Sequence, residues 1–419
     1  MKEIPRLRRM WLAVLAFLAV MGPGIITGSV DNDAGGITTY SVLGAVHGYR
    51  LLWILIPSFV ILIVVQEMNA RMGMVTGKGL ADLIRESYGI KITFFIFVGL
   101  VLADIGNTAT EFAGVAGSMQ VFGVSKYVSV PVAAVLVWFL VVKGTYKSSE
   151  KIFLVFSVFL LSYAISAFMA KPNWGEVMTG LFTPSMPFDR RTIALVLGTI
   201  GTTIAPWMQF YMQSAVIEKG LTIKNYKNSL VDVIAGSTAT VVVAFFIIVA
   251  CGATLHPNGV VIEQAKDAAV ALRPFAGHLA GAVFAFGLLV ASIFSATILP
   301  IATAFYICEA FGFEAGINKK WSEAPFFYGL FTFIELIAVF IILLPKAPLI
   351  SITIWTQVIN AILLPVVLFA MIRLVNNPRI MGSHRNKKAI NVIGYATIIL
   401  LVGLTMVMVI LNVLPGAGP

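Results

Sequence analysis

Three oxygen-bearing side chains stand next to one another where an apolar segment is interrupted. Asp31, Asn32 and Asp33 follow the run Gly22-Pro23-Gly24 inside a segment that is otherwise apolar from 11 to 46. Glycines and polar residues at this density break a membrane helix, and the break frees backbone groups. Because such oxygens suit hard divalent cations, the run predicts a cation site. The alternative is that the acids pair with Lys or Arg or lie at the membrane surface, but ionisable groups at membrane depth are costly and usually functional.

A second interruption lies in the apolar segment from 193 to 217. Pro206 lacks an amide hydrogen and frees a carbonyl about one turn earlier, near Thr202. This carbonyl, the carbonyl of Ala205 and the side chain of Gln209 are the further candidate ligands. An ordinary proline kink would explain the second interruption equally well on its own. Its pairing with the first interruption favours a shared site.

Acidic and amide side chains also line one face of the third apolar segment, 92–122. Asp104, Asn107 and Glu111 are spaced by three and four residues, which places them on one side of a helix. They could line an aqueous path or relay protons, or pair with groups on neighbouring helices. A structural role is favoured for the remaining acids within or near the spans, which are Glu67, Asp232, Glu309 and Glu335.

The composition excludes a soluble protein. Hydrophobic residues make up 59% of the chain and charged residues 11%, with a mean hydropathy of +0.95, which is typical of a polytopic membrane protein. The net charge of +10 does not indicate nucleic acid, because the basic residues are spread between apolar runs. Cys251 and Cys308 lie in apolar segments and give no disulfide framework. No sequence pattern of a hydrolase or a phosphate-binding loop is present, so we expect no enzyme and no cofactor.

Apolar runs of about 20 residues predict the membrane spans. We expect eleven helices and an all-α fold, with approximate bounds 11–46, 50–68, 92–122, 127–143, 152–170, 193–217, 229–253, 274–310, 326–345, 348–374 and 389–414. With the N-terminus in the cytoplasm, 21 of the 29 Lys and Arg residues fall on the inner side. The positive-inside rule therefore predicts a cytoplasmic N-terminus and an external C-terminus in the plasma (inner) membrane, and we expect a monomer in the lipid bilayer.

The two interruptions divide the chain into similar units. A polar interval at about 171–191 separates five helices in 11–170 from five in 193–374, and 389–414 remains as an extra helix. Because each unit has an odd number of helices and begins with its broken one, the second unit enters the membrane from the opposite side. This predicts an inverted five-helix repeat within a single transporter domain.

These features resemble the Nramp divalent-metal transporters, whose fold is of the leucine-transporter type. The resemblance covers most of the chain and rests on the run Gly22-Pro23-Gly24 before the acidic break, the segment 70–86, Ala109-Thr110-Glu111-Phe112-Ala113, Phe286-Gly287, Thr356-Gln357 and the segment 364–382. It places Asp33 at the position of the family's metal-binding aspartate and adds Gln357 to the candidate path residues.

The departures from the family pattern concern the ligands. Ala34, Gly35 and Gly36 replace the three residues that follow the family's aspartate, so that its asparagine is missing, and Asn32 or Asp31 is the candidate substitute. Ala205-Pro206-Trp207 stands where the family has Met-Pro-His. Without a soft thioether, a small, hard and partly hydrated ion is favoured, as in the Nramp-related magnesium transporters. We therefore expect Mg²⁺ as substrate, and also Mn²⁺.

The same departures predict weak or absent proton coupling. Trp207 and Gln213 cannot titrate, and Gly114 stands where the family has a second acid in its third helix. The alternatives that the sequence leaves open are an ordinary proton-coupled Mn²⁺/Fe²⁺ transporter, an organic-solute carrier of the same fold, an ion channel and a membrane-embedded enzyme. Two aspartates in the first break disfavour a carrier for carboxylate substrates.

Overall fold

The computed structural model describes residues 22–144, 161–262, 268 and 273–413, and within them the chain is helical without strands. The helices are α2 Pro23–Asp31, α3 Ala34–His47, α4 Leu55–Thr76, α5 Leu80–Val121, α6 Lys126–Lys143, α8 Leu161–Met169, α9 Trp174–Phe182, α10 Arg190–Thr203, α11 Pro206–Glu218, α12 Tyr226–Thr254, α14 Arg273–Phe311, α15 Pro325–Leu343, α16 Leu349–Val375, α17 Pro378–Met381 and α18 Lys388–Val413. Short 3₁₀ turns, η1 Leu52–Ile54, η3 Ile223–Asn225, η4 His256–Asn258 and η5 Gly382–His384, connect some of them.

Nine stretches of the described residues are long and apolar enough to cross a membrane. They correspond to nine of the eleven predicted spans. The other two are the first and the fifth, and their parts at 11–21 and 152–160 lie outside the described residues. The predicted start of the third span at residue 92 differs from the structure, because α5 begins at Leu80. Its first turns are polar, and Gly89, with a φ of 78°, kinks the helix where the apolar part begins.

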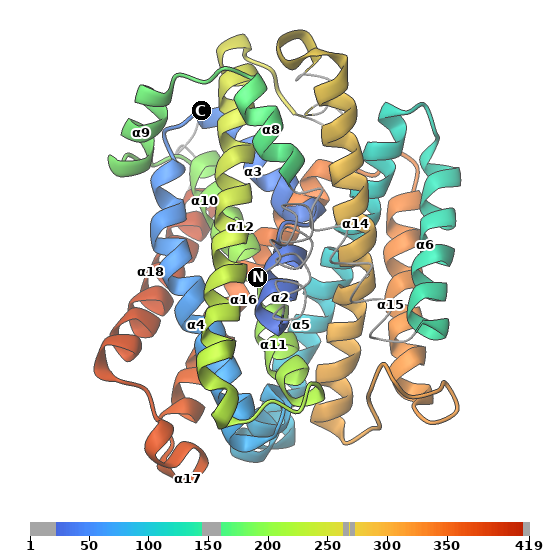
Figure 1. Ribbon diagram of the computed structural model, residues 1–419, viewed down its shortest axis with the longest axis vertical. Coiled ribbons are helices and arrows are strands. Elements are labelled where there is room, and N and C mark those ends of the chain that lie inside the picture. The colour runs from blue at the N-terminus through green and yellow to red at the C-terminus, as the bar shows by residue number, and fades with distance from the viewer. Residues whose placement is uncertain (1–21, 145–160, 263–267, 269–272, 414–419) are drawn as a thin grey trace, which may run out of the picture.

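The two broken helices lie side by side at the centre of the molecule (Figure 1). The half-helix α3 packs against α10, and α2 packs against α11. The long helix α12 runs along both halves of the first broken helix. Its backbone touches that of α2, because a Cβ atom added at Gly236 would lie 2.1 Å from the carbonyl oxygen of Gly24. Asp232 of α12 accepts hydrogen bonds from the Gly22 and Gly24 amides at 2.8 and 2.6 Å, so it caps α2.

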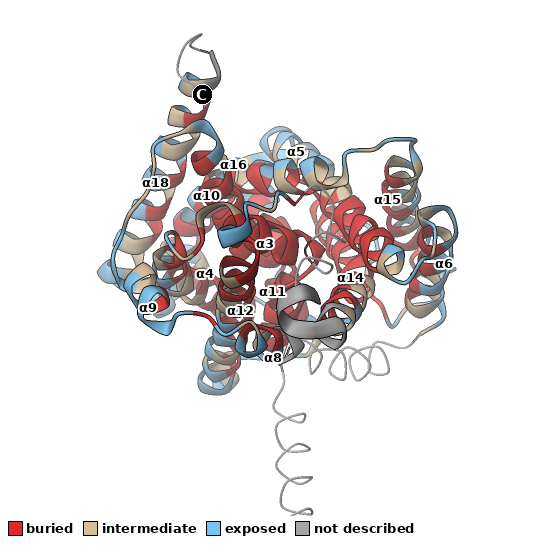
Figure 2. Ribbon diagram, turned by 90° about the horizontal axis from the view of Figure 1, so that it is seen from above, coloured by how far each residue is buried: buried red, intermediate tan, exposed pale blue. Residues whose placement is uncertain are grey.

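The remaining helices pair in the order expected for an inverted repeat. The second, third and fourth helices of the first unit pack against their counterparts in the second unit. These pairs are α4 with α12, α5 with α14, and α6 with α15. Seen from above, the buried residues concentrate around α3, α10, α11 and α14, whereas α6, α9 and α18 present exposed residues at the rim (Figure 2). The polar breaks therefore lie within the most buried part of the bundle.

Candidate functional site

The first break consists of two residues between α2 and α3. Asn32 (φ −86°, ψ 46°) and Asp33 (φ −75°, ψ −174°) leave the helical conformation, and the Asp33 carboxylate caps α3 by accepting the Gly36 amide hydrogen at 2.7 Å. Asp31, Asn32 and Asp33 are only 2%, 0% and 6% exposed. Asp31 Oδ2 and Asn32 Oδ1 have no hydrogen-bond partner among the described residues. The break thus holds buried oxygen atoms that are free to accept.

Glu111 adds a third carboxyl group to this break. Its Oε2 accepts the Ala34 amide hydrogen at 3.2 Å, across 77 residues of sequence, and its Oε1 has no partner in the described part of the chain. Its carboxyl group is also a close neighbour of that of Asp33. Both lie at the N-terminus of α3, where the helix dipole favours negative charge. Asp33 and Glu111 therefore form one acidic cluster with Asp31, and no Lys or Arg of the described residues is an electrostatic neighbour of it.

The second break is arranged differently. Ile204 and Ala205 interrupt the helix, and Pro206 opens α11. The Ala205 carbonyl accepts from the Met208 amide at 3.2 Å and from Gln209 Nε2 at 3.1 Å. Gln209 Oε1 in turn accepts from Asn69 Nδ2 of α4 at 2.6 Å. In this conformation, two of the predicted ligands, Ala205 and Gln209, are bound to the protein itself.

Thr202 is the predicted ligand of the second break that reaches the first. A Cβ atom added at Gly36 would lie 2.7 Å from the Asp31 carbonyl oxygen and 3.4 Å from Thr202 Oγ1, so these two oxygen atoms flank the same glycine. One residue further on, the Thr203 hydroxyl is 2.8 Å from that of Tyr40 on α3. The structure therefore brings Asp31, Asp33, Glu111 and Thr202 together. No group of three His, Cys, Asp or Glu among the described residues is arranged to enclose a metal ion by itself.

Asp104 does not belong to this group. Its Oδ1 accepts from Asn107 Nδ2, and its Oδ2 accepts from the hydroxyl groups of Thr303 and Tyr306, all at 2.9 Å. Since every one of these contacts ties α5 internally or to α14, Asp104 has a packing role in this conformation.

Gln357 links this polar packing to the break. Its Nε2 is 3.5 Å from Asn107 Oδ1, and its Oε1 accepts from Asn360 at 2.9 Å. A Cβ atom added at Gly35 would lie 2.3 Å from Gln357 Nε2 and 3.0 Å from Asp33 Oδ1. A chain of amide side chains thus runs from beside Asp33 to Asp104, with Gln357 at its inner end. A side chain at position 35 would displace the Gln357 amide.

Three further positions could bring other ligands near the break. Met212 packs in a small apolar cluster, with its sulfur 3.9 Å from Thr27 Oγ1 on α2. Met208 belongs to the main apolar core. Gln213 donates to the Lys78 carbonyl at 2.7 Å, at the far end of α11. None of the three contacts Asp31, Asn32 or Asp33 through a hydrogen bond in the structure.

The sequence reasoning did not select Asn69, Tyr40 or Ser295. Each is a buried polar residue that binds one of the breaks, Ser295 by donating to the Val30 carbonyl at 3.2 Å. In the sequence, each of them is a single polar residue inside an apolar segment. Many polar residues that only pack between helices look the same, so this pattern does not identify a site.

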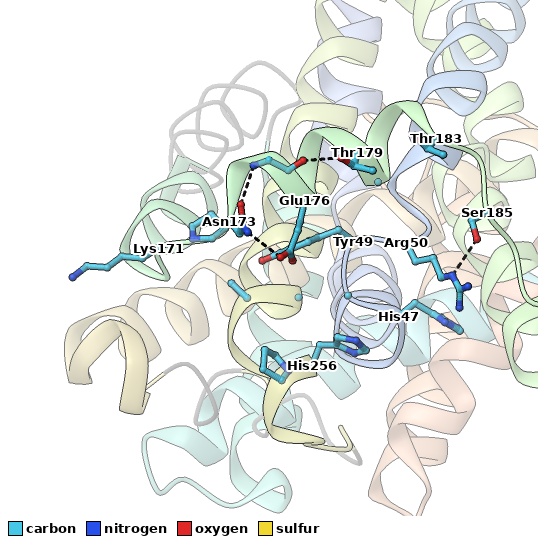
Figure 3. Close-up of a pocket in the computed structure, with 17 residues that line it drawn as sticks. His47, Tyr49, Arg50, Lys171, Asn173, Glu176, Thr179, Thr183, Ser185 and His256 are labelled. Carbon is cyan, nitrogen blue, oxygen red and sulfur yellow. Dashed lines mark hydrogen bonds between the residues drawn. The ribbon is translucent and has the colours of Figure 1, made fainter.

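A large cavity at the other end of α3 is remote from the breaks. It measures about 780 Å³ and lies over the C-terminal end of α3, beside His47, Arg50, Glu176 and His256 (Figure 3). The fourteen residues of α3 separate it from Asp33, a length of about 21 Å. It is therefore separate from the acidic cluster.

Asp189 caps α10 beside this cavity in the way that Asp33 caps α3. It accepts from the Thr192 amide at 2.9 Å and from the Thr192 hydroxyl at 2.5 Å. Slight burial opposes its ionisation, but these hydrogen bonds hold the pKa of the Asp189 carboxyl below its ordinary value. Asp189 is thus an ionised cap without an acidic cluster around it.

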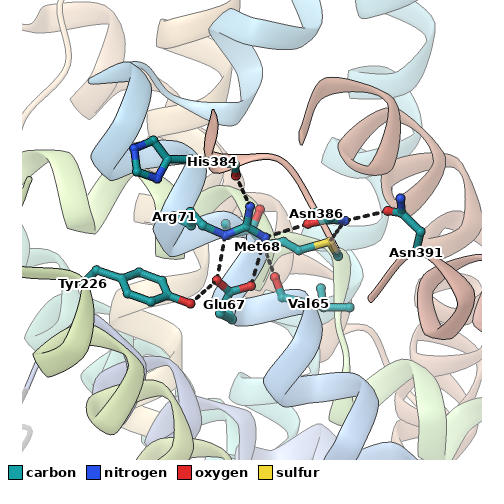
Figure 4. A network of polar contacts seen from close by, with 9 residues as sticks. Val65, Glu67, Met68, Arg71, Tyr226, His384, Asn386 and Asn391 are labelled. Carbon is teal, nitrogen blue, oxygen red and sulfur yellow. Dashed lines mark hydrogen bonds and ion pairs between the residues drawn. The ribbon is translucent and has the colours of Figure 1, made fainter. Parts of the chain in front are cut away.

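A buried ion pair fixes the other end of the bundle (Figure 4). In this Arg71 cluster, Arg71 binds Glu67 one turn earlier on α4 at 2.7 and 3.1 Å, Asn386 at 2.6 Å and the His384 carbonyl. Tyr226 of α12 donates to Glu67 at 2.8 Å. Because Glu67 and Arg71 are each 7% exposed, their charges are compensated mainly by one another.

We expect Arg71→Gln to lower the free energy of unfolding by about 3 to 5 kcal/mol, because it leaves the Glu67 carboxylate buried without its partner. The double variant Glu67→Gln/Arg71→Gln should lose less than the two single variants together. Chemical unfolding in detergent, followed by tryptophan fluorescence, measures both. Lys78→Gln is the control, since the Lys78–Glu86 pair is about half exposed and should contribute about 1 kcal/mol or less. Additive losses in the double variant would contradict this account.

Comparisons with known proteins agree with this architecture. The divalent metal cation transporter MntH of Bacillus subtilis (strain 168) is 26% identical over 408 residues, covering 94% of this chain and 92% of that protein. MntH of Yersinia pestis (strain Pestoides F) is 24% identical over 402 residues, covering 94% and 95%.

Solved structures show the fold. A manganese transporter of Eremococcus coleocola, in complex with an aromatic bis-isothiourea substituted compound, has a TM-score of 0.73 at 20% identity, covering 98% of this chain and 88% of that chain. MhsT in complex with L-phenylalanine has a TM-score of 0.62 at 13% identity, covering 92% and 98%. The leucine-transporter-type fold expected from the sequence is confirmed.

The Nramp family model, described as natural resistance-associated macrophage protein-like, matches residues 24–411. This match includes both broken helices and extends over nearly the whole described chain. The chain belongs to the Nramp family.

Proposed function

We propose that this chain is a secondary transporter that takes up divalent cations, Mg²⁺ foremost and Mn²⁺ as well, by alternating access. The single observation that carries the proposal is the acidic cluster at the first break. Asp31, Asp33 and Glu111 are buried together without a cationic side chain among the described residues, and some of their oxygen atoms accept no hydrogen bond. Several uncompensated carboxyl groups at membrane depth are costly unless a cation visits them.

The chemistry of the donor set supports a hard ion. Asp31, Asn32, Asp33 and Thr202 offer oxygen atoms, while Ala205 and Trp207 offer neither a thioether nor an imidazole. The absence of a three-residue cage among the described residues fits an ion that keeps part of its water shell, as Mg²⁺ does. Opening the first turn of α11 would release the Ala205 carbonyl and Gln209 toward the ion.

We place the protein in the plasma membrane as a monomer, with its N-terminus in the cytoplasm and its C-terminus outside. The distribution of the basic residues supports this orientation. For a divalent cation, an inside-negative potential of 100 mV supplies about 4.6 kcal/mol. This alone would sustain an accumulation of roughly a thousandfold or more.

A second candidate is a proton-coupled Mn²⁺/Fe²⁺ transporter of the ordinary Nramp type. The chain's similarity to divalent metal cation transporters and to a manganese transporter favours this candidate. An amino-acid carrier, as the likeness to MhsT with its bound L-phenylalanine would indicate, is disfavoured because the acidic cluster repels a carboxylate.

The two candidates differ in proton movement. In proteoliposomes with an inside-negative potential and a pH-sensitive dye inside, we expect saturable Mg²⁺ and Mn²⁺ uptake without acidification, because the α11 side chains Trp207 and Gln213 cannot carry protons. Uptake should rise with the imposed potential. Parallel measurements with Ca²⁺ establish the preference order. Acidification that tracks Mg²⁺ entry would reject the uncoupled mechanism, and Mn²⁺ uptake without Mg²⁺ uptake would favour the second candidate.

A further inference from the structure

A polar cavity of about 630 Å³ opens where α5, α16 and α18 meet, at the end of the molecule that carries α17 (Figure 1). Its lining includes Tyr88 of α5, Arg373 and Asn377 at the end of α16, and Asn391 and Tyr395 of α18. No acidic residue lines it. The cavity therefore presents one full positive charge among hydroxyl and amide groups.

Arg373 is the only charged residue in this lining, and it is available to a ligand. Its side chain is exposed and makes no ion pair within the described part of the chain. The Tyr88 hydroxyl is an electrostatic neighbour of its guanidinium group. A guanidinium group offers five N–H donors in a planar fork that matches two oxygen atoms of a phosphate. The chemistry of the cavity thus fits a phosphodiester.

An apolar stripe on α16 leads to the same arginine. Ile362, Val366 and Phe369 are 38%, 48% and 49% exposed, and together with Arg373 they follow one another at intervals of four, three and four residues. This spacing places all four on one face of the helix. Val392 and Ile399 of α18 are also exposed, at 66% and 72%. An exposed apolar stripe that ends on an unpaired cation has the two parts that a phospholipid needs, a path for its acyl chains and a partner for its headgroup.

We propose that this cavity binds the headgroup of an anionic phospholipid, whose acyl chains lie along the α16 stripe. The amide floor of the cavity is fixed in advance, because Asn391 and Asn376 exchange hydrogen bonds at 2.8 and 3.0 Å. Asn391 also accepts from Asn386, which in turn binds Arg71. The lipid headgroup would therefore contact Asn391, which is linked through Asn386 to the Arg71 cluster shown in Figure 4.

The test uses the full-length protein in detergent, titrated with dioleoyl phosphatidylglycerol or dioleoyl phosphatidylcholine and followed by native mass spectrometry. We expect the parent to bind phosphatidylglycerol about tenfold more tightly than phosphatidylcholine. Both lipids carry a phosphate, but the choline ammonium of phosphatidylcholine offsets its charge, whereas phosphatidylglycerol keeps a net negative charge for Arg373. Arg373→Gln should lose this preference, and Arg373→Lys should keep part of it. Arg379→Gln removes an exposed arginine of α17 that does not line the cavity, and it should keep the full preference.

Three results would overturn the proposal. The first is an unchanged preference for phosphatidylglycerol in Arg373→Gln. The second is an equal loss in Arg379→Gln, which would indicate general surface charge and not the cavity. The third is displacement of phosphatidylglycerol by millimolar inorganic phosphate, which would identify a site for a free anion. Melting temperatures in phosphatidylcholine-containing micelles serve as the folding check, and Arg373→Lys keeps the test valid if Arg373→Gln is less stable.

Discussion

Asp33→Asn is expected to reduce Mg²⁺ uptake into proteoliposomes by at least about a hundredfold while leaving the fold intact. Asn retains an oxygen atom that can accept the Gly36 amide hydrogen, so the cap of α3 survives. What disappears is a full negative charge at the ion. At an effective dielectric constant of 20, a divalent cation about 4 Å from a carboxylate gains roughly 8 kcal/mol, and a third of this is enough for a hundredfold effect.

Two further variants separate the charge from the cap. Asp33→Ala removes both, so it should lose uptake to the same extent and also about 1 kcal/mol of stability. Asp189→Asn changes the corresponding cap of α10, outside the acidic cluster, and should leave uptake within about twofold of the parent. Uptake in Asp33→Asn above about a tenth of the parent level would place the ion elsewhere.

The positions of the two helix breaks along the chain could be predicted, because they depend on local chemistry. Glycines and acids in an apolar segment break a helix wherever they occur, and Pro206 marks the second break in the same way. The inverted repeat followed from counting an odd number of spans per unit. The start of α5 was less predictable. Its first turns are polar and end at a kink at Gly89, and a search for apolar runs does not detect polar turns of a helix.

The composition of the site depended on contacts that local patterns do not contain. Glu111 and Asp104 lie on the same face of α5, seven residues apart, and the sequence pattern predicts the same role for both. In the fold, Glu111 meets the amide of Ala34, whereas Asp104 meets two hydroxyl groups of α14. The difference comes from which neighbouring helix faces each turn. A single sequence does not specify that neighbour.

The second break shows the same limit for backbone groups. A proline predicts a backbone carbonyl that lacks its helical hydrogen-bond donor. It does not predict which other group will donate to that carbonyl. Gln209 reaches back to the Ala205 carbonyl while Asn69 holds Gln209 from α4. The predicted ligands Ala205 and Gln209 are therefore present but engaged, and these hydrogen bonds must break before either group can bind an ion.

Ala205→Met is expected to change ion selectivity, since it restores a thioether where this chain has only a methyl group. We expect Mg²⁺ uptake to fall at least about tenfold relative to Mn²⁺ uptake, because a soft ligand that displaces water favours Mn²⁺ over an ion that dehydrates reluctantly. Competition between the two ions in proteoliposomes measures the ratio directly. Ala205→Leu is the matched control, with similar bulk but no sulfur.

This comparison separates ligand chemistry from space. Ala205 is 2% exposed, so a larger side chain in a dry, packed position would cost about 1 to 3 kcal/mol and impair both ions equally. If the methyl group instead borders room for a hydrated ion, Met and Leu both fit, and only Met shifts the ratio toward Mn²⁺. Equal loss of both ions in Ala205→Met and Ala205→Leu would mean that Ala205 packs the break and does not face the ion. A change in the Mg²⁺/Mn²⁺ uptake ratio in Ala205→Met alone would show that the residue at position 205 sets the preference for a hard ion. We expect Met208→Ala to leave this ratio unchanged.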